Sequence, residues 1–138
     1  EKKADKLKYL IKEKTILITA DTIVVHKGVI LGKPKDKLEA LSSINLLSGN
    51  SHKVITGVCI KSLEKEISYC EETVVCFKSL SQEEIIYYIE KYQPYDKAGS
   101  YGVQEWIGLV GVKNINGSYS NVVGLPSASL IERLKDFI

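Results

Sequence analysis

Four polar motifs interrupt stretches of apolar sequence, and they contain the side chains best suited to chemistry. The motifs are Ala20-Asp21-Thr22, Leu31-Gly32-Lys33-Pro34, the segment 96–104 and the segment 121–126. Asp21 lies within a β-forming run, 15–25, where a carboxylate either faces a cleft or is buried at high cost. A carboxylate that faces a cleft is suited to act as a metal ligand or as a general base. The structural alternative is a buried acceptor for backbone N–H groups.

A lysine follows on the next predicted strand. Lys27-Gly28 favours a turn between strands 15–26 and 29–31. We therefore expect Asp21 and Lys33 on adjacent strands, at the mouth of the same cleft. There the carboxylate activates water or holds a divalent cation, and the ammonium neutralises a phosphate. The alternative for Lys33 is a solvated strand end.

The third motif places further polar side chains on a glycine-rich stretch. Lys97 is suited to contact a phosphate, and Gln104 to read a nucleobase edge or to hold a metal-bound water. The alternative is a tight turn in which Gln104 is a core amide with satisfied hydrogen bonds. The segment 117–121 offers hydroxyls and a flexible backbone, and its alternative is a surface loop.

Composition excludes several classes of protein. The 138 residues make about one domain, and a net charge of +2 is too small for a nucleic-acid footprint. No apolar run is long enough to span a membrane, and we expect no secretory leader. Three cysteines without metal or redox spacing indicate buried free thiols in the cytoplasm. His26 and His52 are isolated, which favours polar residues at strand ends over metal ligands.

The order of predicted elements indicates a layered α/β domain with a mixed, twisted sheet flanked by helices. We expect helices at 1–14, 36–47, 81–92 and 126–138, strands at 15–26, 29–31, 52–62 and 67–77, a glycine-rich mixed region at 96–112 and a loop at 114–120. Neither a phosphate-binding loop of the Gly-x-x-x-x-Gly-Lys-Ser/Thr type nor a dinucleotide fingerprint is present.

Taken together, the motifs resemble the Maf family of nucleoside triphosphate pyrophosphatases over essentially the whole chain. The motifs that agree, in the family's order, are 20–22, 32–34, 47–49 with His52 and 56–58, 96–104, and 117–118 with 121–126. The resemblance implies an elongated α/β domain with a cleft, often homodimeric. It also implies hydrolysis of a nucleoside triphosphate to the monophosphate and pyrophosphate with Mg²⁺ or Mn²⁺.

The resemblance also implies roles for individual residues. Asp21 is the catalytic carboxylate and a candidate metal ligand, Lys33 contacts the phosphates, and Gln104 lies in the active site. Lys3 matches a lysine on an early helix that faces the cleft. Thr22 resembles the branch that acts on dTTP and UTP.

One motif of the family has no counterpart in this sequence. Family members open with a strand and a Ser-x-Ser-Pro-Arg-Arg-like loop, and Arg133 is the one arginine here. We therefore expect residues 1–138 to form a single Maf-like domain that lacks about the first 50 residues of the family pattern. The alternative function is a non-catalytic nucleotide- or protein-binding regulator of cell division and septum formation.

Overall fold

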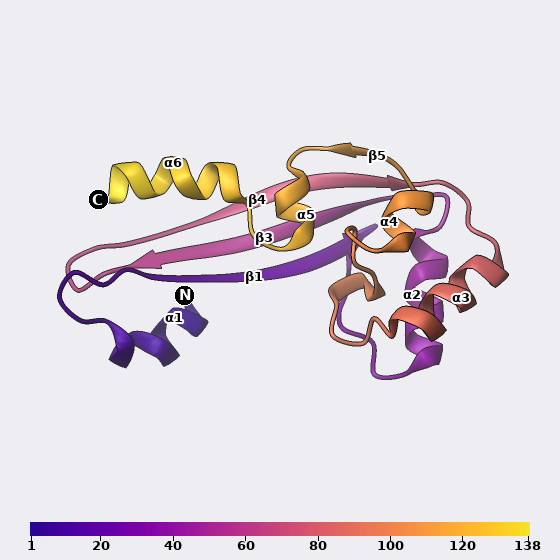
Figure 1. Cartoon of the computed structure of the whole chain (residues 1–138), viewed down its shortest axis with the longest axis horizontal. Coiled ribbons are helices and arrows are strands. Elements are labelled where there is room, and N and C mark those ends of the chain that lie inside the picture. The colour runs from indigo at the N-terminus through magenta and orange to yellow at the C-terminus, as the bar shows by residue number, and fades with distance from the viewer.

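Three long antiparallel strands form the frame of the molecule (Figure 1): β1 (Leu17–His26), β3 (Ser51–Lys61) and β4 (Glu66–Phe77). The computed structural model describes residues 1–138. Two short strands, β2 (Val29–Leu31) and β5 (Val112–Asn116), complete a five-stranded sheet of order β2-β1-β3-β4-β5. The long strands give the molecule its elongated shape, with most helices at its two ends.

The predicted α/β class is confirmed, but the sheet is antiparallel at every pairing rather than mixed. The β1–β2 hairpin reverses the chain, so β2 and β3 run in the same direction. They are not neighbours, because β1 lies between them. The hairpin turn itself is as predicted: Lys27 and Gly28 both have positive φ, 47° and 79°, as a two-residue hairpin turn requires.

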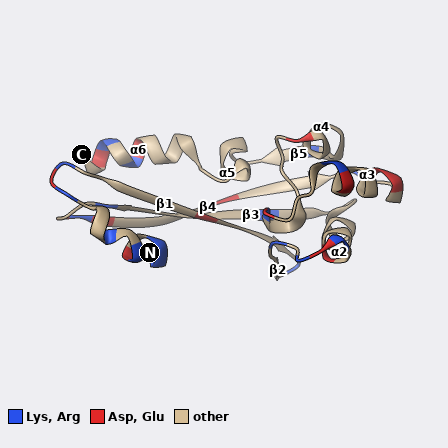
Figure 2. Ribbon diagram, turned by 60° about the horizontal axis from the view of Figure 1, so that its bottom comes forward, with Lys and Arg blue, Asp and Glu red and all other residues tan.

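Alternate side chains of β3 are buried, as expected for a strand with one covered face. These side chains are His52, Val54, Thr56, Val58 and Ile60, and the one buried side chain on the other face of β3 is Cys59. Val54 belongs to the main core, which includes residues of α2 (Lys37–Leu47) and α3 (Gln82–Tyr92). Val58 and Ile60 belong to a smaller core completed by Leu130 and Phe137 of α6 (Ser127–Phe137). Helix α1 (Lys2–Leu7) lies on the opposite side of the sheet from α6 (Figure 2).

The three long helices begin where their sequence signals predict. The Asp36 carboxylate accepts a hydrogen bond from the Glu39 N–H at the start of α2. Ser81 and Glu84 form the predicted capping box of α3, and Pro126 precedes α6. No helix combines the length and apolar character needed to cross a membrane.

Three predicted segments differ from the structure. The helix expected over 1–14 is limited to α1 and a 3₁₀ turn, η1 (Lys8–Leu10), because Ala4 is its only buried residue and the helix gains little from packing. The region 96–112 contains η2 (Ala98–Ser100) and α4 (Trp106–Gly111). The predicted loop at 114–120 overlaps β5 and the start of α5 (Tyr119–Val123).

Candidate active site

A cavity of about 280 Å³ opens beside β1, next to the middle of the sheet. It collects five of the six predicted site residues, namely Asp21, Thr22, Lys33, Lys97 and Gln104. Asp21 and Gln104 are exposed, so the buried-acceptor alternative for the first and the core-amide alternative for the second are both wrong. Lys33 is also exposed after β2, but it lines the cavity and does not only end a strand.

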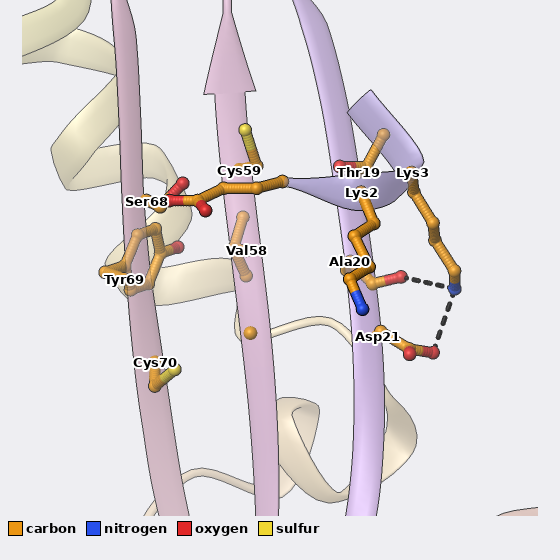
Figure 3. A pocket seen from close by; sticks show the side chains of 12 residues that line it. Lys2, Lys3, Thr19, Ala20, Asp21, Val58, Cys59, Ser68, Tyr69 and Cys70 are labelled. Carbon is orange, nitrogen blue, oxygen red and sulfur yellow. Dashed lines mark hydrogen bonds and ion pairs between the residues drawn. The ribbon is translucent and has the colours of Figure 1, made fainter. Parts of the chain in front are cut away.

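The sixth residue, Lys3, reaches Asp21 from α1 (Figure 3). Its Nζ lies 2.9 Å from Asp21 Oδ1 and donates a second hydrogen bond to the carbonyl of Ala20 at 3.0 Å. The Asp21 side chain is 73% exposed, and its other oxygen has no protein partner. Asp21 also lines a neighbouring cavity of about 470 Å³ beneath α1, so this carboxylate stands between two hollows.

The register of the sheet leaves room around this carboxylate. Asp21 lies opposite Gly57 of β3, which in turn lies opposite Cys70 of β4. Gly57 has no side chain, so the sheet surface next to the Asp21 carboxylate stays open to a ligand.

Thr22 is half-buried and bonds to the residues that line the α5 side of the cavity. Its hydroxyl lies 2.9 Å from that of Thr56, which is fully buried, and 3.4 Å from the carbonyl of Gly124. The Thr56 hydroxyl also donates to the carbonyl of Asn121 at 3.4 Å. Thr22 and Thr56 therefore tie β1 and β3 to the end of α5, whose residues line the cavity.

Asn121 fixes α5 to the sheet. Its side chain is fully buried, and Nδ2 lies 3.3 Å from the Val54 carbonyl, 3.1 Å from the Glu71 carbonyl and 2.9 Å from Thr73 Oγ1. Thr73 also bonds to the backbone of Ser118. The surface-loop alternative for 117–121 therefore fails for Asn121, while Gly117 and Tyr119 are exposed. Neither Asn121 nor Thr56 was predicted as a supporting residue, although Asn121 lies in the polar motif 121–126 and Thr56 in the separately noted segment 56–58.

Lys97 does not carry a free charge into the cavity. Its Nζ lies 3.0 Å from Asp96 Oδ1 and 3.1 Å from Glu105 Oε1. Burial acts to lower the pKa of Lys97, but the hydrogen bonds to the two carboxylates outweigh it and raise the pKa above its usual value. The hydrogen bond from Lys97 lowers the pKa of Asp96 in turn. Glu105 was missed from the sequence because its partners lie on other elements.

Both histidines lie at strand ends, as expected, and both are buried. His52 Nε2 lies 2.6 Å from the hydroxyl of Tyr101, a residue that lines the cavity. Burial, and to a lesser degree the charge of His26, lowers the pKa of His52 to about 4. The neutral imidazole of His52 therefore binds the Tyr101 hydroxyl inside the protein.

The cavity offers carboxylates to a cation but no closed cage. No group of three or more His, Cys, Asp or Glu side chains converges anywhere in residues 1–138. The carboxylates that line the cavity are those of Asp21 and Asp96, both largely exposed. This donor set fits a hard divalent cation that takes most of its ligands from water and phosphate oxygens.

Comparison with known proteins identifies the family of the chain. The family model described as Maf-like protein matches residues 1–137. The chain belongs to the Maf family. It is 50% identical over 130 residues to the dTTP/UTP pyrophosphatase of Porphyromonas gingivalis. These aligned residues make up 94% of this chain and 65% of that protein. The chain is 52% identical over 133 residues to the dTTP/UTP pyrophosphatase of Bacteroides fragilis, covering 96% and 69%.

A third Maf relative, the dTTP/UTP pyrophosphatase of Flavobacterium johnsoniae, is 47% identical over 138 residues, which is 100% of this chain and 71% of that protein. This Maf chain thus spans about two thirds of the length of the curated relatives it matches.

Proposed function

We propose that this Maf chain carries the reaction centre of a nucleoside triphosphate pyrophosphatase that acts on dTTP and UTP. The observation that carries the proposal is the convergence of Asp21, Lys33, Lys97 and Gln104 on one cavity, with Lys3 bonded to Asp21. The activity after which relatives about 50% identical are named supports the same reaction class.

The charges around the cavity support the proposal that the substrate brings a cation of its own. The ammonium groups of Lys3, Lys33 and Lys97 are matched by the carboxylates of Asp21, Asp96 and Glu105, so their formal charges cancel. A nucleoside triphosphate brings about four negative charges to this neutral surface. Mg²⁺ or Mn²⁺ would be held mostly by the phosphates, with Asp21 either as a ligand of the cation or as the base of the reaction, and would supply charge neutralisation.

In the proposed reaction, the oxygen of a water molecule forms a bond to the α-phosphorus, and the bond from that phosphorus to the bridging oxygen breaks. The products are the monophosphate and pyrophosphate. Asp21 accepts a proton of the attacking water, for which its exposed carboxylate has one oxygen free of protein partners. Lys33 forms no ion pair within the chain, and it stabilises charge that develops on the phosphates.

Recognition of the base is assigned to the mouth of the cavity. Gln104 is exposed there, and its amide can both donate to and accept from a pyrimidine edge. Thr22 is proposed to contribute to dTTP and UTP selectivity through the Gly124 carbonyl that it contacts. The proposal extends to a homodimer in the cytoplasm, where the three free thiols stay reduced.

The test is pyrophosphate release from dTTP, UTP, CTP and 7-methyl-GTP with Mg²⁺ or Mn²⁺. It is run on this chain and on a chain extended to the length of its relatives. We expect release from dTTP and UTP above the other two nucleotides. Nucleotide binding by both chains without any release of pyrophosphate would replace the enzyme with the non-catalytic regulator.

A further inference from the structure

The ammonium of Lys97 lies between two carboxylates that differ sharply in their surroundings. The Asp96 side chain is 76% exposed and lines the cavity. The Glu105 side chain is 18% exposed, does not line the cavity, and reaches Lys97 from the protein interior. Glu105 therefore binds the Lys97 ammonium on the side of the protein interior, and Asp96 binds it on the side of the cavity.

The rear carboxylate is anchored to the core. The hydroxyl of Tyr88, a fully buried residue of α3, donates to Glu105 Oε2 at 3.1 Å and accepts from the Gly102 N–H at 3.0 Å. Burial raises the pKa of Tyr88, so the phenol keeps the proton that it donates. Glu105 is thus fixed at one oxygen by the core and presents the other to Lys97.

The space for this contact depends on Gly102. A Cβ at this position would lie 2.6 Å from Glu105 Oε1 and 3.0 Å from Lys97 Cε. The two side chains meet directly over the backbone of Gly102, whose N–H is bonded to Tyr88. Gly102, Glu105 and Tyr88 together define the place of the Lys97 ammonium.

The two carboxylates are expected to respond differently to an incoming phosphate. An exposed ion pair such as Lys97–Asp96 is weak and screened by salt, so a phosphate can replace Asp96. A largely buried, charge-assisted bond with a second anchor is held more firmly, so Glu105 stays in place.

From these contacts we propose that Glu105 is a positioning residue for substrate binding. It holds the Lys97 ammonium at the cavity wall while a substrate phosphate takes the place of Asp96. The inference rests on the proposed function, because it assigns Lys97 to the phosphates of that substrate. Lys97 is taken to bind the phosphates equally in the ground state and the transition state, so its loss acts on KM.

The test compares Glu105→Gln with Glu90→Gln, which removes a carboxylate from an exposed ion pair with Lys37 on the outside of α3. For dTTP hydrolysis we expect Glu105→Gln to raise KM about fivefold to tenfold and to leave kcat within about twofold. In a Lys97→Met background the same change should have no further effect on KM. A lower melting temperature with an unchanged KM would overturn the proposal and make Glu105 purely structural.

A second readout does not depend on catalysis. The ¹H–¹⁵N NMR signal of the Lys97 ammonium should be visible in the parent chain and lost in Glu105→Gln, and the dissociation constant for dTTP should rise. If the parent chain hydrolyses nothing, the proposed function fails, and these two measurements still decide the role of Glu105. An unchanged ammonium signal together with an unchanged dTTP affinity in Glu105→Gln would overturn the positioning role of Glu105. If Glu105→Gln does not fold, Tyr88→Phe keeps the Glu105 carboxylate but removes its anchor, together with the acceptor of the Gly102 N–H, and should shift both measurements in the same direction.

Discussion

Lys3 Nζ lies 2.9 Å from Asp21 Oδ1, and this contact joins the first helix to the strand that borders the cavity. Both side chains are more than half exposed, so the contact contributes little to folding. Its place beside the proposed reaction centre indicates a role in chemistry. The contact keeps one carboxylate oxygen occupied and leaves the other available.

Lys3→Met tests that role. We expect turnover of dTTP to fall by about tenfold or more, because a cation next to the reacting carboxylate is lost, while the unfolding free energy changes by less than about 1 kcal/mol. Lys61→Met is the matched control, since Lys61 also links α1 to the sheet through Asp5 but lies outside the cavity. Equal loss of turnover in the two variants would reduce Lys3 to a residue that docks α1.

Thr56→Val tests the hydroxyl network beneath the cavity. The substitution keeps the shape of the side chain but removes the partner of Thr22 and the donor to the Asn121 carbonyl. We expect the unfolding free energy, measured with urea, to fall by about 1–3 kcal/mol, because the hydrogen bonds of the buried hydroxyl to Thr22 and to the Asn121 carbonyl are lost. Thr56→Ser keeps the hydroxyl and should lose less. If Val were tolerated better than Ser, the network would not be stabilising.

The sequence-based predictions succeeded where signals were local. The Lys27-Gly28 turn needs only two residues with positive φ, and it brings Asp21 and Lys33 to one cavity as expected. They failed for β5 and α5, whose support comes from distant residues. Asn121 bonds to the Val54 carbonyl, 67 residues away along the chain, and no local pattern encodes that contact. The same reason hid Glu105, whose anchor lies on α3.

His52 predicts how stability depends on pH. Its pKa falls from 6.5 in the unfolded chain to about 4 in the folded one, because burial disfavours the imidazolium. Between these values the unfolded state binds more protons, so the stabilising contribution is complete above about pH 6.5 and is lost as the pH falls toward 4. The loss amounts to up to about 3 kcal/mol.

Urea unfolding at several pH values measures this effect. His52→Gln retains a polar partner for the Tyr101 hydroxyl but does not titrate, so it should flatten the dependence between pH 6.5 and 4. A parent chain and a His52→Gln variant with parallel pH profiles would show that other groups govern acid unfolding.

The central claim is that Asp21 performs chemistry in the cavity, and Asp21→Asn tests it most directly. The variant is compared with Glu64→Gln, which changes an exposed carboxylate in the β3–β4 turn. Both are assayed for pyrophosphate release from dTTP in the chain extended to the length of its relatives. The account predicts that Asp21→Asn abolishes release while the melting temperature stays that of the parent, and that Glu64→Gln leaves both unchanged. Release near the parental rate by a folded Asp21→Asn variant would contradict it.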